Sequence, residues 1–317
     1  MDVVSNVMDG PSHLLSSSDL TADQIRDLLD LASRLKRRPR PVLAGKELAL
    51  LFEKPSLRTR MSFEVGMRRL GGDAVYMAPA EVGIGEREAI KDVARAVSRY
   101  VDIVAFRTFG QANIEEYARF STVPVINALT EEEHPCQALA DLQTLQEKWG
   151  DVSGHSLAYI GDGNNVAASL VVTATSLGMD VRVASPPGYG LPEAIAVEAS
   201  GRAQASGGSF SVLTAPDEAA RGAEAVYTDV WTSMGQERET ERRRLAFEGY
   251  RVDRTLLNYA APNPLVMHDL PAHRGEEITE DAIEAPGSII FDQAENRLWA
   301  QAAVVVTLLG LATSVES

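Results

Sequence analysis

The chain has 317 residues, about twice the length of a typical single domain, so its length predicts two domains. Hydrophobic residues make up 45% and charged residues 24% of the chain, which excludes a disordered chain, a collagen and a disulfide scaffold. The formal net charge of −15 disfavours a nucleic-acid partner, because DNA and RNA are themselves polyanions.

Cysteine usage and hydropathy bear on the compartment. The single cysteine, Cys136, excludes an intrachain disulfide and is typical of a reducing cytoplasm, which is the expected location. The most apolar stretch, 302–315, is shorter than the ~20 residues of a membrane span. The first residues lack the basic and then apolar pattern of a signal peptide. We therefore expect no membrane partner.

The first half of the chain alternates between helical and strand patterns. Asp19 or Thr21 can cap a first helix, which Pro39 ends. Short apolar runs then predict strands, and amphipathic runs predict helices between them. The predicted strands are 47–52, 74–77, 103–107 and 123–128, and the predicted helices after the first are 58–70, 90–100, 114–120 and 136–149.

A polar break with two glycines, 150–154, precedes a second set of such patterns. A charged segment within it, 236–247, is expected to be mobile. The helix at 294–311 is apolar on several faces towards its end, which is typical of a buried helix. The other predicted helices are 166–177 and 192–205, and the predicted strands are 157–161, 180–186, 209–214, 223–229, 265–270 and 288–292.

Strands that alternate with helices predict an α/β fold, in which parallel sheets carry helices on both faces. We expect two such domains, 1–149 and 150–292. The C-terminal helix, 293–317, is predicted to pack back against the first domain.

The segment from Phe52 to Arg60, FEKPSLRTR, is the first candidate site. A strand ends there, a proline turns the chain, and hydroxyl and guanidinium side chains open a helix. Backbone N–H groups and the dipole at a helix N-terminus favour anions, and arginine adds charge and a forked donor. A phosphate site fits this pattern, although an ordinary capped helix with solvated arginines fits it as well.

Five further segments place polar side chains at strand ends or helix starts. His134 and Gln137 in EHPCQ can donate hydrogen bonds, and Asn165 in YIGDGNNV lies where ligands bind in open α/β sheets. The GxGxxG spacing of dinucleotide loops is absent from that segment. The other three are TDVWTSMGQE at 228–237, MHDLPAHRG at 267–275 and FDQAENR at 291–297, and each one alone also has a purely structural reading.

Taken together, these motifs resemble the aspartate/ornithine carbamoyltransferase family in order and spacing, from about residue 15 to 312. The resemblance rests on S-x-R-T-R (56–60), H-P-x-Q (134–137), G-D-x-x-N-N (161–165), S-M-G (233–235) and F-D-Q-A-E-N-R (291–297). The S-M-G motif with Asp229 favours ornithine over aspartate as the amine acceptor.

The resemblance implies roles for individual residues. Domain 1–149 would bind carbamoyl phosphate, and domain 150–292 would bind L-ornithine. The implied carbamoyl phosphate ligands are Ser56, Leu57, Arg58, Thr59, Arg60, Arg107, His134, Gln137, Arg297 and the backbone carbonyls of Asp269 and Leu270. The implied ornithine ligands are Asn165, Asp229, Ser233 and Met234, and the implied catalytic residues are Arg107, His134, Asp269 and Arg297.

The implied reaction transfers the carbamoyl group to the side-chain amine of ornithine, which gives citrulline and phosphate in arginine metabolism. That amine has a reference pKa near ~10.4, so it must lose a proton before it attacks. The scheme needs no metal or organic cofactor, and no His, Cys and carboxylate cluster at metal-ligand spacing stands out. Family members are trimers or assemblies of trimers, so we expect a homotrimer with active sites at the subunit interfaces.

Two positions depart from the family pattern. Asp269 stands in H-D-L-P where the family has H-C-L-P, and Gly83 stands where many members have a glutamine. A carboxylate near the reacting amine would hold it protonated, or it could accept its proton as a general base. Two alternatives therefore remain open: a transferase for another amine, such as N-acetylornithine or putrescine, and a homologue with impaired catalysis.

Overall fold

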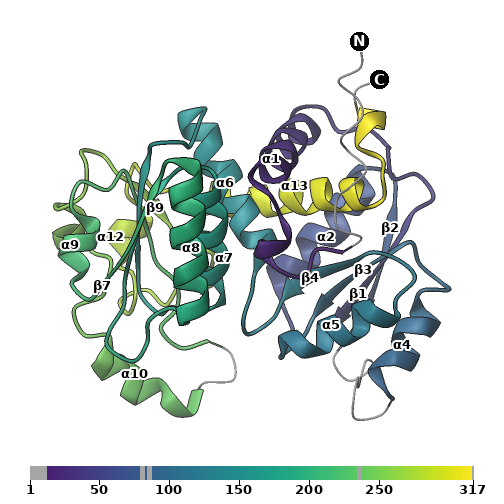
Figure 1. The fold of residues 1–317 in the computed structure, drawn as a ribbon, viewed down its shortest axis with the longest axis horizontal. Coiled ribbons are helices and arrows are strands. Elements are labelled where there is room, and N and C mark those ends of the chain that lie inside the picture. Colours follow the sequence, from purple (N-terminus) through teal and green to yellow (C-terminus); the bar gives the residue numbers. More distant parts are fainter. Residues whose placement is uncertain (1–12, 79–82, 84–87, 234–236, 316–317) are drawn as a thin grey trace. The chain divides into compact units, whose positions relative to one another are not determined.

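The computed structural model describes residues 13–78, 83, 88–233 and 237–315. The chain forms two compact units (Figure 1). The first unit comprises Met1–Gln143 and Glu295–Ser317, and the second comprises Thr144–Ala294. The division falls inside helix α6 (Pro135–Trp149).

The first unit is built on a four-stranded sheet in the order β2-β1-β3-β4, with every pair parallel. Strand β3 is buried at every position, as expected for a strand with helices on both faces. The strands are β1 (Glu47–Phe52), β2 (Asp73–Met77), β3 (Ile103–Arg107) and β4 (Val125–Leu129), and the helices are α1 (Ala22–Arg37), α2 (Leu57–Arg69), α4 (Ile90–Val97) and α5 (Gln111–Phe120).

Local sequence explains where these helices begin. Thr21 forms a capping box with Gln24, in which each side chain bonds the other's backbone N–H at the start of α1. Ser56 caps α2 through a hydrogen bond from the Thr59 backbone N–H. Both caps lie directly before the first apolar turn, so both helix starts could be predicted within a residue or two.

The last long helix, α13 (Ile290–Leu308), contributes its residues from Glu295 onward to the first unit. There Lys36 of α1 donates to Asn296 at 2.8 Å. A Cβ placed on Gly66 of α2 would lie 3.5 Å from the Leu298 carbonyl oxygen, so α2 and α13 pack closely. The prediction that the C-terminal helix returns to the first domain is confirmed.

The second unit is built on a five-stranded parallel sheet in the order β7-β6-β5-β8-β9. Its strands are β5 (Ser156–Ile160), β6 (Asp180–Ala184), β7 (Ser209–Leu213), β8 (Ala225–Tyr227) and β9 (Leu265–Met267), and its helices are α7 (Asn165–Ser176), α8 (Glu193–Ser206), α9 (Pro216–Ala220), α10 (Thr240–Ala246), α11 (Arg254–Leu257) and α12 (Glu280–Ile283). The predicted α/β class with two parallel sheets is confirmed.

One prediction in the second unit is wrong. The segment 288–292 is not a strand: Ser288 makes only an isolated bridge to Val266, and α13 begins at Ile290. Its apolar run is short enough to fit either structure, and the helical continuation decides between them. The described part of the charged segment 236–247 contains helix α10, in which Arg243 is buried. Gln236 lies outside the described residues, and the mobility of the segment stays a prediction.

Among the described residues, no helix is long and apolar enough to cross a membrane. Short 3-10 helices at Ser17–Asp19, Glu237–Glu239 and Ala312–Val315 complete the described elements.

Candidate functional site

The candidate residues of the first unit lie at one edge of its sheet. Because all four strands are parallel, their carboxyl ends share that edge. Ser56 to Arg60 follow β1, Arg107 ends β3, and His134 lies five residues beyond the end of β4. The sheet thus gathers segments that are far apart in the sequence.

The N-terminus of α2 presents a set of hydrogen-bond donors. The Ser56 hydroxyl donates to Thr59 Oγ1 at 3.0 Å, and the Arg297 guanidinium donates to the same oxygen. Arg297 is only 3% exposed, so its charge is held inside the unit beside the free N–H groups of the helix start. An anion placed at this helix end would meet the helix dipole and a buried guanidinium together.

Arg107, His134 and Gln137 are also buried, at 5%, 2% and 1% exposure. Gln137 donates to Asp141 at 2.7 Å, which fixes its amide, and its Oε1 is buried without a hydrogen-bond partner among the described residues. Buried guanidinium and amide groups supply positive charge and hydrogen-bond donors, and both suit an anionic ligand.

Arg60 differs from the other predicted phosphate ligands. Its Nε bonds Glu64 at 2.8 Å, and its guanidinium lies over the Tyr76 ring at 3.8 Å from the centroid. The guanidinium of Arg60 therefore contacts Glu64 and Tyr76 rather than Thr59. It is Arg297 that bonds the Thr59 hydroxyl.

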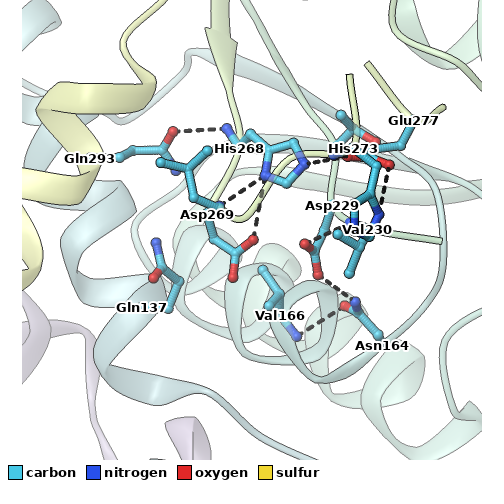
Figure 2. Close-up of polar contacts among 12 residues, drawn as sticks. Gln137, Asn164, Val166, Asp229, Val230, His268, Asp269, His273, Glu277 and Gln293 are labelled. Atoms are coloured by element: carbon cyan, nitrogen blue, oxygen red, sulfur yellow. Dashed lines mark hydrogen bonds and ion pairs between the residues drawn. The ribbon is translucent and has the colours of Figure 1, made fainter. Parts of the chain in front are cut away.

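In the second unit, Asn164 links the start of α7 to Asp229 (Figure 2). Its side-chain oxygen accepts from the backbone N–H groups of Val166 and Ala167, and its Nδ2 donates to Asp229 at 2.7 Å. The neighbouring Asn165, predicted as an ornithine ligand, is the first residue of α7, and its role stays a prediction. The sequence analysis assigned no role to Asn164, the N-cap of this helix.

The structure describes two of the other three predicted ornithine ligands. Asp229 is buried and lies two residues after the end of β8. Ser233 belongs to the described residues, a few positions along the same loop. Met234 lies outside the described residues.

His268 lies between two carboxyl groups (Figure 2). Its Nε2 lies 3.2 Å from Glu277 Oε1, and its Nδ1 lies 3.6 Å from Asp269 Oδ1. The Leu270 N–H points at Nδ1 at 2.9 Å, and Gln293 accepts from the His268 backbone N–H. Sequence reasoning flagged the MHDLPAHRG segment but assigned His268 and Glu277 no role, because only the folded turn brings them together.

These contacts shift the pKa values of the cluster. Burial alone would lower the pKa of His268, but hydrogen bonds with Asp269 and Glu277 and the charges of Asp229 and Asp269 raise it to about 9. Burial, followed by the charge of Asp269, raises the pKa of Asp229 well above its usual value. Nδ1 can accept from the Leu270 N–H when it holds a lone pair, and it can donate to Asp269 when protonated. The cluster therefore holds exchangeable protons at neutral pH.

A buried ion pair supports the loop that follows β8. Arg243 of α10 donates to Asp162 at 2.7 Å and to the Trp231 carbonyl oxygen at 2.8 Å. Burial raises the pKa of Asp162, and the Arg243 charge opposes that shift. The loops after β5 and β8 are thereby tied together, and no sequence pattern indicated this pair.

Among the described residues of the second unit, two groups of side chains have ligand atoms close enough to hold a metal ion: Asp229, His268 and Asp269, and His273, Glu276 and Glu277. A separate cavity of about 660 Å³ lies between α9, α10 and α11, lined by Trp231, Leu245, Leu256 and Tyr259 among others. Neither Asp229 nor His268 lines this cavity, so we do not place the acceptor site there.

Comparison with known proteins identifies the family. Residues 12–147 match the family model described as "Aspartate/ornithine carbamoyltransferase, carbamoyl-P binding domain", and residues 153–308 match its "Asp/Orn binding domain". The chain belongs to the aspartate/ornithine carbamoyltransferase family. The two matches fall on the two halves of the chain in the order that the motifs predict.

Relatives cover nearly the whole chain. It is 51% identical to the ornithine carbamoyltransferase of Gloeobacter violaceus, over 94% of this chain and 95% of that protein. It is 50% identical to that of Acidothermus cellulolyticus, over 95% and 97%. The structure of the Pyrococcus furiosus ornithine carbamoyltransferase matches with a TM-score of 0.91 and 47% identity, over 94% of this chain and 97% of that one. The family assignment from the motifs is confirmed.

Proposed function

We propose that this chain is an ornithine carbamoyltransferase, which transfers the carbamoyl group of carbamoyl phosphate to the side-chain amine of L-ornithine. The observation that carries the proposal is the near-complete match to relatives bearing that name, at 51% and 50% identity. The buried donors of the first unit and the carboxyl cluster of the second suit the two substrates, one an anion and the other an amine.

We propose that carbamoyl phosphate binds in the first unit. Its phosphate would meet the α2 N-terminus from Ser56 to Thr59 and the Arg58 guanidinium. Arg107, His134 and Arg297 would donate to the carbonyl oxygen, which gains negative charge as the carbon is attacked. Gln137 would hold the carbamoyl amide.

We propose that ornithine binds in the second unit, with Asp229 and Asn165 near its charged groups and Ser233 and Met234 along its length. Asp269 accepts a proton from the side-chain ammonium. The free amine then attacks the carbonyl carbon. A C–N bond forms and the C–O bond to phosphate breaks. Phosphate leaves with the second amine proton.

The test is an assay of the purified protein with carbamoyl phosphate and an acceptor panel of ornithine, N-acetylornithine, putrescine and aspartate. We expect carbamoylation of ornithine, measured as citrulline, to exceed that of the other amines by orders of magnitude. A faster reaction with another amine would replace the proposed acceptor. Carbamoyl phosphate binding without any product would favour the impaired homologue.

We also propose a homotrimer with active sites at the subunit interfaces. Exposed apolar side chains support it: Leu57 and Met61 stand one turn apart on α2, and Val75 lies on the edge strand β2, with 74%, 50% and 51% exposure. A sedimentation measurement should give three times the 34.2 kDa chain mass. Met61→Glu with Val75→Glu should lower that mass.

We place the protein in the cytoplasm because its one cysteine, Cys136, is a buried free thiol.

A further inference from the structure

We propose that His273, Glu276 and Glu277 form a binding site for a divalent transition-metal ion such as Zn²⁺. One ligand atom from each side chain lies within 4.8 Å of the other two. The Nδ1 of His273 is 3.8 Å from Glu277 Oε2. Two ligands on one tetrahedral Zn²⁺ at about 2.0–2.2 Å lie roughly 3.4 Å apart, so only a small adjustment would bring these atoms onto an ion.

The two oxygens of Glu277 have different surroundings. Oε1 faces His268 Nε2 at 3.2 Å and accepts from the His273 backbone N–H. Oε2 is buried and has no hydrogen-bond partner among the described residues. A buried carboxylate oxygen without a partner costs free energy, and a cation beside it would remove that cost. The unpartnered oxygen is the one that lies towards His273 Nδ1.

The backbone prepares this arrangement before any ion binds. A tight turn runs from His273 to Ile278, with hydrogen bonds from Glu276 N to the His273 oxygen at 2.9 Å and from Gly275 N to the Ile278 oxygen at 2.8 Å. Gly275 has a φ of 92°, which an L residue rarely adopts. The side chain of His273 is 51% exposed, so an ion has a path from solvent.

Donor chemistry limits the choice of ion. One imidazole and two carboxylates suit Zn²⁺, Co²⁺ or Mn²⁺, whereas Mg²⁺ and Ca²⁺ prefer oxygen ligands alone. Arg244 donates to Glu276 Oε1 at 3.3 Å and is itself 54% exposed. An exposed ion pair of this kind contributes little, so a divalent ion could displace it.

This site differs from the Asp229, His268 and Asp269 group, to which the proposed function assigns the amine. The metal proposal does not depend on that function, since binding can be measured without turnover. The experiment is titration calorimetry of the full chain with Zn²⁺ alone, checked by the visible spectrum of the Co²⁺ form. We expect one ion per chain and no displacement by excess Mg²⁺.

His273→Ala should weaken Zn²⁺ binding by about tenfold or more, and Glu276→Gln should weaken it as well. His155→Ala is the matched control, because it removes another partly exposed histidine that pairs with a glutamate. Arg244→Gln should tighten binding. Unchanged affinity in His273→Ala would overturn the proposal, and so would a loss of binding in Asp269→Asn that His273→Ala does not share.

Discussion

The candidate regions of the two units hold opposite charge inside similar parallel sheets. The first gathers the buried cations Arg107 and Arg297 beside a helix N-terminus. The second gathers three carboxyl groups, those of Asp229, Asp269 and Glu277, around one histidine. Under the proposed function, the first region would stabilise an anion and its leaving phosphate, and the second would take up a proton from an amine. Similar sheets would then serve different chemistry through the side chains at their carboxyl edges.

The largest effect should come from Arg297→Ala. This change removes a buried guanidinium that bonds Thr59 at the α2 N-terminus, and we expect kcat/KM for carbamoyl phosphate to fall by about 10²–10³-fold or more. Arg60→Ala is the comparison, because Glu64 and Tyr76 already engage that side chain. We expect it to lose less than about tenfold. Equal losses would remove the distinction drawn between the two arginines.

In the second unit, Asp229→Asn should raise the KM for ornithine by about 10–100-fold, because a charged hydrogen bond contributes about 1.5–3 kcal/mol. The KM for carbamoyl phosphate should change little. Steady-state kinetics with each substrate varied in turn separate the two values. A rise confined to carbamoyl phosphate would contradict the division of labour between the units.

Asn164→Ala should have a smaller effect. It removes the α7 cap and the 2.7 Å bond to Asp229, so we expect a loss of about 1–2 kcal/mol in the free energy of unfolding. Asn165→Ala, at the next position, should cost less than half of that. Chemical denaturation of both variants provides the measurement, and the reverse order of stabilities would show that the wrong asparagine has been assigned as the cap.

The smallest effect concerns pH and stability. The pKa of His268 is raised from 6.5 to about 9 in the folded chain. Its contribution to the free energy of unfolding is therefore complete below pH 6.5 and is lost as the pH rises through 9. The raised pKa of Asp229 acts in the same direction. We expect the unfolding midpoint to fall across this window, by about 2–4 °C for each kcal/mol lost. His268→Gln should flatten that dependence, and an unchanged slope in this variant would assign it to other groups.

The sequence predicted most of the fold, because local signals agree with the tertiary structure. Strands 47–52 and 103–107 have the predicted bounds, and Thr21 and Ser56 cap the predicted helices. The run at 288–292 was misread because a short apolar segment fits a strand or a helix equally well. The start of α13 was settled only by packing.

The candidate site was predicted in part. Motifs named Ser56 to Arg60, His134, Asp229 and Asp269, whose roles stay predictions, but they did not show that Asn164 caps α7 or that Arg60 lies against Tyr76. The contacts of His268 with Glu277 and of Arg243 with Asp162 join residues that periodicity does not relate. Side-chain direction and long-range pairing therefore required the structure.

The most direct test of this account is the pH–rate profile of citrulline formation by the natural chain and by Asp269→Cys. We predict turnover by the natural chain. We also predict an activity limb at higher pH in the variant, because a thiol has a reference pKa near ~8.5 and an aspartate one near ~3.9. Superimposable profiles would contradict a role for Asp269 in accepting the amine proton, and no citrulline from either protein would contradict the proposed reaction.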